Sequence, residues 1–277
     1  MSSRQVPLAL GVIALLGFWD ASAQERFFPA VRSFELPEAS PRVHGMVGRI
    51  ISARRGDSRF GDEREGEAVL GENFPIVTLR RGNHPIVLGF GSQVYGRFSL
   101  ADAKSSLISI DWLAGVNTTA WLGAWALTLE LFHESSHLGD EYGERFQISR
   151  LDWSREVITG WVAYGAGQWR FTSGASYVFT DGLGLPRPAA SFGVDFKGRS
   201  PFEGVASLQP IAGVFIEGTS ATSWRLSTSA KLGVVMVTPG RNRQFGLALI
   251  AHDGLSTQRQ FFRQESRYLG VELRFDL

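Results

Sequence analysis

One short segment gathers most of the side chains in this sequence that could do chemistry. Residues 131–142, which read LFHESSHLGDEY, contain two of the five histidines, two serines and three carboxylates. Imidazole, hydroxyl and carboxylate groups at this spacing can bind a metal ion or activate a serine as a nucleophile. The backbone decides between these chemistries, because a helix and a strand present the same side chains in different directions.

The run His133–His137 matches the H-E-x-x-H pattern of zinc proteases, in which a helix brings both histidines to one metal ion. The preceding residues predict a strand instead, because leucine alternates with smaller or polar residues over residues 126–131. On a strand, residues four apart lie about 13 Å apart. One zinc ion with bonds of about 2 Å cannot hold both rings at that distance. The sequence therefore indicates no metal site, and it indicates no cofactor.

The same strand geometry suits a hydrolase. His133 and Ser135 are two residues apart, so they share a face, and by parity it is the apolar face that carries Leu129 and Leu131. A histidine beside a serine on a lipid-facing surface is the arrangement of an enzyme that cleaves acyl esters, with imidazole taking the hydroxyl proton. Glu130 faces the other side, so a residue that orients the histidine would come from a neighbouring strand.

This segment resembles the His-x-Ser-Asn motif of outer-membrane phospholipase A and of the lipid A deacylase barrels. The resemblance implies that His133 is the base and Ser135 the nucleophile, although Ser136 stands where those families have Asn. The alternative interpretation is an ordinary polar strand end at the headgroup level of a membrane. In both cases we expect the strand to end here and the following loop to contain Ser136, His137, Asp140 and Glu141.

Strands with alternating side chains must position this segment, and they recur along the chain. Residues 86–98 place five apolar side chains on one face and mainly glycine and polar residues on the other, and residues 169–179 and 224–234 repeat this pattern. The aromatic residues gather near the strand ends, as Trp169 and Phe179 do. This distribution is typical of a barrel with an aromatic belt at each membrane interface.

The beginning of the chain predicts export. Arg4, an apolar run over residues 6–19 and small residues at 21–23 form the pattern of a secretory signal peptide, cleaved after Ala23. The chain has no cysteine, which excludes disulfides, thiolate metal ligands and acylation of a terminal cysteine. Its formal net charge of +1 provides no basic field, so we expect no nucleic-acid partner.

After residue 23 no apolar stretch reaches the length of a spanning helix, which leaves an exported soluble domain or a closed barrel. The alternation, with 32 glycines, 20 phenylalanines and 8 tryptophans, favours the barrel. We predict an all-β protein, an antiparallel transmembrane β-barrel of about twelve strands in the outer membrane. Residues 1–23 would be the signal peptide, residues 24–42 an extended lead-in and residues 43–277 the barrel.

Charged residues on the predicted lumen face should pair and fill the interior of so small a barrel. They are Asp111, Arg170, Asp195, Lys231, Glu272 and Arg274. A small pore remains an alternative function. The last strand, residues 269–277, alternates to its end and resembles the closing strand that the barrel assembly machinery recognises. That machinery and outer-membrane lipids are therefore the expected partners.

A longer resemblance covers most of the mature chain. Residues 74–77, the strands through Phe98, the strand of Asp111 and Trp112, and above all residues 135–141 (SSHLGDE) resemble an uncharacterised Gram-negative outer-membrane protein family. That family is a domain of unknown function, and its core reads H-x-S-S-H-L-G-D-E. The resemblance implies export and a shared fold but no activity. The sequence thus predicts a structural or lipid-interacting barrel, with a serine-dependent lipid acyl hydrolase as the alternative.

Overall fold

The computed structural model describes residues 26–27, 33–54, 64–101, 104–200, 207–237 and 244–276. The predicted signal peptide lies outside these residues. The strands that form the barrel are β2 Met46–Arg54, β3 Arg64–Arg81, β4 His84–Ser99, β5 Leu107–Leu122, β6 Trp125–Leu138, β7 Trp153–Ala166, β8 Trp169–Asp181, β9 Pro188–Lys197, β10 Ser207–Thr219, β11 Ser227–Val237, β12 Gln244–Leu255 and β13 Glu265–Asp276.

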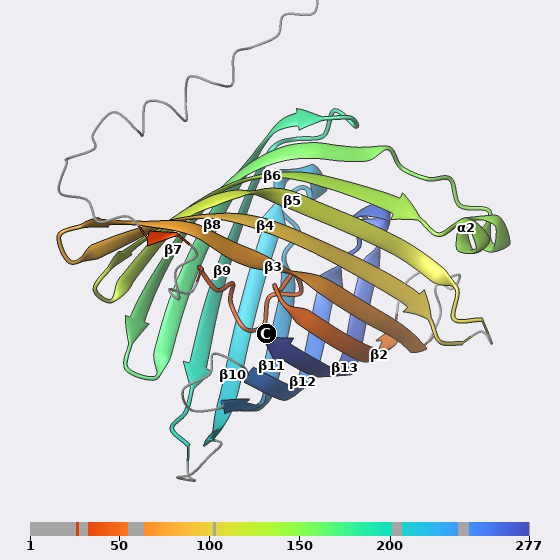
Figure 1. Ribbon diagram of the computed structural model, residues 1–277. Coiled ribbons are helices and arrows are strands. Elements are labelled where there is room, and N and C mark those ends of the chain that lie inside the picture. Colours follow the sequence, from red (N-terminus) through yellow and green to blue (C-terminus); the bar gives the residue numbers. More distant parts are fainter. Residues whose placement is uncertain are drawn as a thin grey trace, which may run out of the picture.

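These twelve strands form one closed antiparallel β-barrel (Figure 1). Each strand pairs with the next along the chain, and β13 pairs with β2 to close the ring. The sheet has a thirteenth member, the two-residue β1 (Arg26–Phe27), which pairs with β3. The predicted fold class and strand number are confirmed.

The barrel wall is apolar on its outer face and polar on its inner face, the reverse of a water-soluble protein. Leu232, Leu249 and Leu269 point outward and are each more than 60% exposed, whereas Gln93 and Arg97 point inward and are buried. An outward apolar surface around a polar interior is what a barrel in lipid requires. The alternation predicted for the strand of residues 86–98 is therefore confirmed, with its polar face toward the lumen.

The connections at the two ends of the barrel differ. At one end, the hairpins β3–β4, β5–β6 and β7–β8 turn through Gly82, Gly123 and Gly167, whose φ angles of +61° to +64° suit glycine. At the other end lie longer connections that carry short helices: α2 (Asp140–Phe146), η1 (Ser220–Thr222) and η2 (Arg259–Phe261). Among the described residues, no helix has the length and apolar character needed to cross a membrane.

The lumen is occupied by residues 33–45, which we call the lumenal strap, just before β2. Phe34 stacks on Trp161, with ring centroids 6.1 Å apart. The backbone N–H of Glu38 donates to Asp195 on β9 (2.9 Å), and the strap carbonyl of Val43 accepts from the Tyr95 hydroxyl (3.2 Å). These contacts from both ends of the strap to several strands hold it inside the barrel.

Ion pairs fill much of the remaining interior. Glu272 accepts from Arg49 Nε (2.8 Å) and lies 2.7 Å from Lys231 Nζ, and Arg97 binds both Glu65 and Glu67. The other predicted lumen charges are paired as well: Asp111 with Arg42, Asp195 with Arg170, and Arg274 with Glu38. The predicted lumen charges are therefore paired as expected, four of them with one another and Asp111 and Arg274 with residues of the lumenal strap.

We expect the substitution Glu272→Leu to lower the free energy of unfolding by about 3 to 5 kcal/mol, because it leaves two buried cations without their shared carboxylate. The matched control is Asp253→Asn, which breaks an exposed pair with Arg267 (2.8 Å) and should cost less than about 1 kcal/mol. Urea unfolding in detergent micelles, followed by tryptophan fluorescence, measures both. Equal destabilisation by the two variants would contradict a structural role for the lumenal network.

Candidate functional site

Strand β6 carries the predicted site on its outward face. His133 and Ser135 lie on the same side as Leu127 and Leu129, which are 40% and 43% exposed. The His133 side chain is 48% exposed. The predicted strand and the predicted shared face are therefore what the structure shows, and the site faces away from the lumen.

A carboxylate on strand β7 contacts His133. Glu156 lies opposite His133 in the antiparallel register, and its Oε1 is 2.9 Å from His133 Nδ1. Because a carboxylate only accepts, the proton of this bond sits on Nδ1, and Nε2 is left as the basic nitrogen of the ring. Sequence analysis missed Glu156, since its 23-residue separation from His133 becomes contact only through the pairing of β6 with β7.

Ser135 is close to this pair but not bonded to it. In the register it lies between Trp112 on β5 and Ser154 on β7, so its backbone belongs to both ladders. Its hydroxyl makes no hydrogen bond to any described residue, His133 included. The site thus consists of a histidine held by Glu156 and, on the same face, a serine whose hydroxyl has no hydrogen-bond partner among the described residues.

The strand continues further than expected, which corrects part of the sequence analysis. Ser136 and His137 lie in β6, which ends at Leu138, and Asp140 and Glu141 begin helix α2 instead of lying in an irregular loop. Ser136 faces the lumen and is buried, so it lies on the other side of the wall from His133 and Ser135. The alternation of the strand persists through three more residues, to Leu138, because β5 continues to pair with it.

The zinc-protease pattern is split between the two faces of the wall. Glu134 points into the lumen, where it accepts from Trp153 Nε1 (3.0 Å) and from Arg259 Nε (2.7 Å), while both histidines point outward. A zincin needs all three side chains on one side of a helix. The structure describes no cluster of three or more histidines or carboxylates that could hold a metal ion.

The surroundings of the His133–Glu156 pair are apolar. Trp112 and Ile158, on the adjacent strands, are 47% and 37% exposed on the same outward surface. At Glu156 the pairing of β7 with β8 shifts register, because β8 contains one extra residue opposite Glu156 and Val157. Such irregularities redirect side chains and occur often beside active sites.

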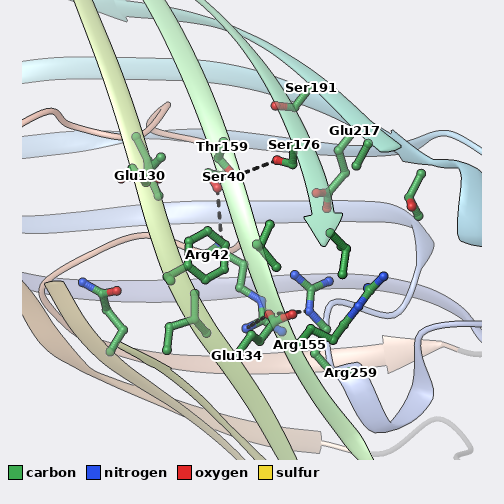
Figure 2. A pocket seen from close by; sticks show the side chains of 18 of the residues that line it. Ser40, Arg42, Glu130, Glu134, Arg155, Thr159, Ser176, Ser191, Glu217 and Arg259 are labelled. Carbon is green, nitrogen blue, oxygen red and sulfur yellow. Dashed lines mark hydrogen bonds and ion pairs between the residues drawn. The ribbon is translucent and has the colours of Figure 1, made fainter. Parts of the chain in front are cut away.

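A second candidate lies inside the barrel. A cavity of about 240 Å³ is lined by the lumenal strap, by strands of the wall and by η2. Figure 2 shows Arg155 and Arg259 at one side of this space, with Glu217, Ser176 and Ser191 at the other. Sequence analysis did not single out these residues, because they come from distant parts of the chain.

Solved structures of outer-membrane phospholipase A share this fold. The Salmonella typhi protein, described as a dimer with bound calcium, has a TM-score of 0.55 and 14% identity, covering 86% of this chain and 94% of that chain. The Escherichia coli protein has a TM-score of 0.55 and 14% identity, covering 84% and 93%. LpxR from Salmonella typhimurium has a TM-score of 0.41 and 9% identity, covering 84% and 100%.

At these identities the likeness shows the fold alone, that of an outer-membrane-type β-barrel. No curated protein sequence matches the chain. The predicted resemblance to an uncharacterised family is confirmed by a family model that matches residues 33–277. The chain belongs to the family described as "Protein of unknown function (DUF1207)".

Proposed function

We propose that this protein is a serine hydrolase of lipid acyl esters, with its site on the outer wall of the barrel. The observation that carries the proposal is the 2.9 Å contact of His133 Nδ1 with Glu156 Oε1, on the same lipid-facing surface as Ser135. Polar and ionisable groups facing lipid are costly, so they mark functional positions. The phospholipase structures add only that this fold can carry such an enzyme.

In the proposed reaction, Ser135 rotates to donate its proton to His133 Nε2 as Oγ attacks the ester carbonyl. Glu156 holds the Nδ1–H tautomer and stabilises the imidazolium that forms. The imidazolium then protonates the leaving alcohol, and a fatty acyl group remains on Ser135. Water, activated by the same histidine, releases the fatty acid and restores the serine.

The tetrahedral intermediate also needs a hydrogen-bond donor for its oxyanion. The backbone N–H groups of this part of β6 are engaged in the ladders with β5 and β7, so the donor must come from a side chain. His137 is the next outward residue after Ser135 on the same strand, and it is exposed. We assign the oxyanion donor to its ring N–H.

The proposed location is the outer membrane, reached by way of the signal peptide and the barrel assembly machinery. Tight turns face the periplasm in barrels of this class, and longer connections face outward. That rule places α2, η1 and η2 at the cell surface, and the His133 site on the side of the membrane toward them. The substrate would then be a lipid of the outer leaflet. A small pore has less support, since the strap and the ion pairs occupy the lumen.

For the location, we expect the mature protein to sediment with outer membranes and to migrate faster on gels when unheated, as folded barrels do. The reason is that the closed sheet resists detergent until it is heated. Fractionation of cells that express the full chain measures this. Recovery in the soluble periplasmic extract would refute the proposal.

For the nucleophile, we expect Ser135→Ala to abolish release of fatty acid from phospholipid or lipid A by the purified protein, a loss of about 10³-fold or more. Ser154→Ala is the matched control, because Ser154 lies beside Ser135 on the neighbouring strand of the same face. Activity of the control should stay within twofold. Equal activity of the two variants would exclude Ser135 as the nucleophile.

For the orienting group, we expect a graded loss of kcat with KM unchanged. Glu156→Gln keeps an acceptor for His133 Nδ1 but loses the charge, and it should reduce kcat about 10-fold to 100-fold, whereas Glu156→Ala loses both and should reduce kcat about 10⁴-fold. Steady-state kinetics on mixed micelles resolves the two parameters. A change confined to KM would show that Glu156 acts in lipid binding instead.

A further inference from the structure

The lumenal cavity is lined by charged groups whose hydrogen-bonding capacity the protein uses only in part. Arg155 on β7 is only 7% exposed, and its guanidinium rests against the Trp153 ring, 4.8 Å from the centroid. Within the described part of the chain it has one ion pair, which joins Nε to Asp181 Oδ1 at 3.4 Å, and it makes no hydrogen bond there. A guanidinium has five N–H donors, and those that lack a hydrogen-bond partner inside the protein can bind an acceptor on a ligand.

A second guanidinium lies beside the first. Arg259, on η2, is fixed by its Nε, which donates to Glu134 (2.7 Å), and by its backbone N–H, which donates to Asp111 (3.3 Å). Its guanidinium lies 5.7 Å from the same Trp153 ring. Its terminal nitrogens make no hydrogen bond to a described residue, so two arginine forks face one cavity (Figure 2).

A carboxylate stands opposite these arginines. Glu217 on β10 lines the same cavity and has no hydrogen bond or ion pair with any described residue. Ser191 and Ser227 flank it in the register of the neighbouring strands, and both also line the cavity. Figure 2 shows Glu217 across from Arg155 and Arg259.

The charged residues that line the cavity indicate the kind of ligand that it could bind. Five arginines line the cavity, and four of them lie against a carboxylate: Arg42 against Asp111, Arg155 against Asp181, Arg225 against Glu265 and Arg259 against Glu134. Among the described residues the fifth, Arg187, has no ion pair, so its charge balances that of Glu217. A lone anion on the free forks would be repelled by Glu217, and a lone cation on Glu217 would be repelled by the arginines. A molecule that carries both charges meets both sets of groups at once.

We propose that the lumenal cavity binds a small zwitterion, whose phosphate or carboxylate lies on Arg155 and Arg259 and whose ammonium group lies on Glu217. Guanidinium forks match the oxygen geometry of both anions, and serine hydroxyls beside the carboxylate add acceptors for the ammonium protons. The cavity volume of about 240 Å³ limits the ligand to the size of a headgroup fragment or an amino acid. This site lies on the other side of the wall from His133 and does not depend on the proposed hydrolase.

Isothermal titration calorimetry on the folded full barrel in detergent tests the proposal. The probes are phosphoethanolamine and β-alanine as zwitterions, inorganic phosphate and ethanolamine as their separate halves, and a short-chain phosphatidylethanolamine. We expect at least one soluble zwitterion to bind ten times or more tightly than either half. Binding of the intact phospholipid alone would locate the site in a lipid contact and overturn the lumenal assignment, as would equal binding of the halves.

Two variants separate the two charges. Glu217→Gln should lower the affinity for the zwitterion by 10-fold or more, because it removes the partner of the ammonium group. The affinity for phosphate should be unchanged or slightly higher. Arg155→Gln should lower the affinity for both the zwitterion and phosphate. Arg267→Gln, at an exposed arginine outside the lumen, is the control and should change neither. Heat-modifiable gel mobility checks that each variant is folded, and equal loss of phosphate and zwitterion binding in Glu217→Gln would overturn the proposal.

Discussion

The closed backbone ladder is the constraint on which the other features of this protein depend. A strand in hydrocarbon has no water to satisfy its N–H and C=O groups, so every strand must have two neighbours. The pairing of β13 with β2 meets that requirement by joining the two ends of the sheet. Once the sheet is closed, each strand has one face in lipid and one in a confined interior, and the side chains must divide accordingly. The inward charges and outward leucines are consequences of that division.

Closure also explains why both candidate sites are built across strands. Neighbouring strands bring residues far apart in sequence to adjacent positions, so Glu156 reaches His133 only through the β6–β7 pairing. In the lumen, distance across the barrel is short, and Arg259 from η2 can bind Glu134 on β6. The outer wall thus holds a linear row of groups, whereas the interior holds a cluster that surrounds a cavity. Chemistry on a lipid and recognition of a small polar molecule suit these two geometries respectively.

Much of the architecture could be predicted from the sequence because the alternation of apolar and polar side chains along a strand is a local pattern. The alternation in residues 86–98 fixed which side chains share a face, and closure made those faces lumen and lipid. The shared face of His133 and Ser135 followed from the same rule. Glu156 could not be predicted, because register between strands is set by pairing and not by local pattern. The lumenal strap was expected only as an extended lead-in, since its contacts are with residues far along the chain: Val43 contacts Tyr95, 52 positions away, and Glu38 contacts Asp195, 157 positions away.

The position of the lumenal strap affects how the closed barrel is held together. The strap runs directly into β2, the strand that forms the final seam with β13, so it belongs to the same end of the chain that must close the cylinder. Glu38 reaches β9, and Val43 reaches β4, on opposite sides of the seam. The strap therefore links strands on both sides of the seam through the lumen, so the closed barrel is held by these internal contacts as well as by the β13–β2 ladder.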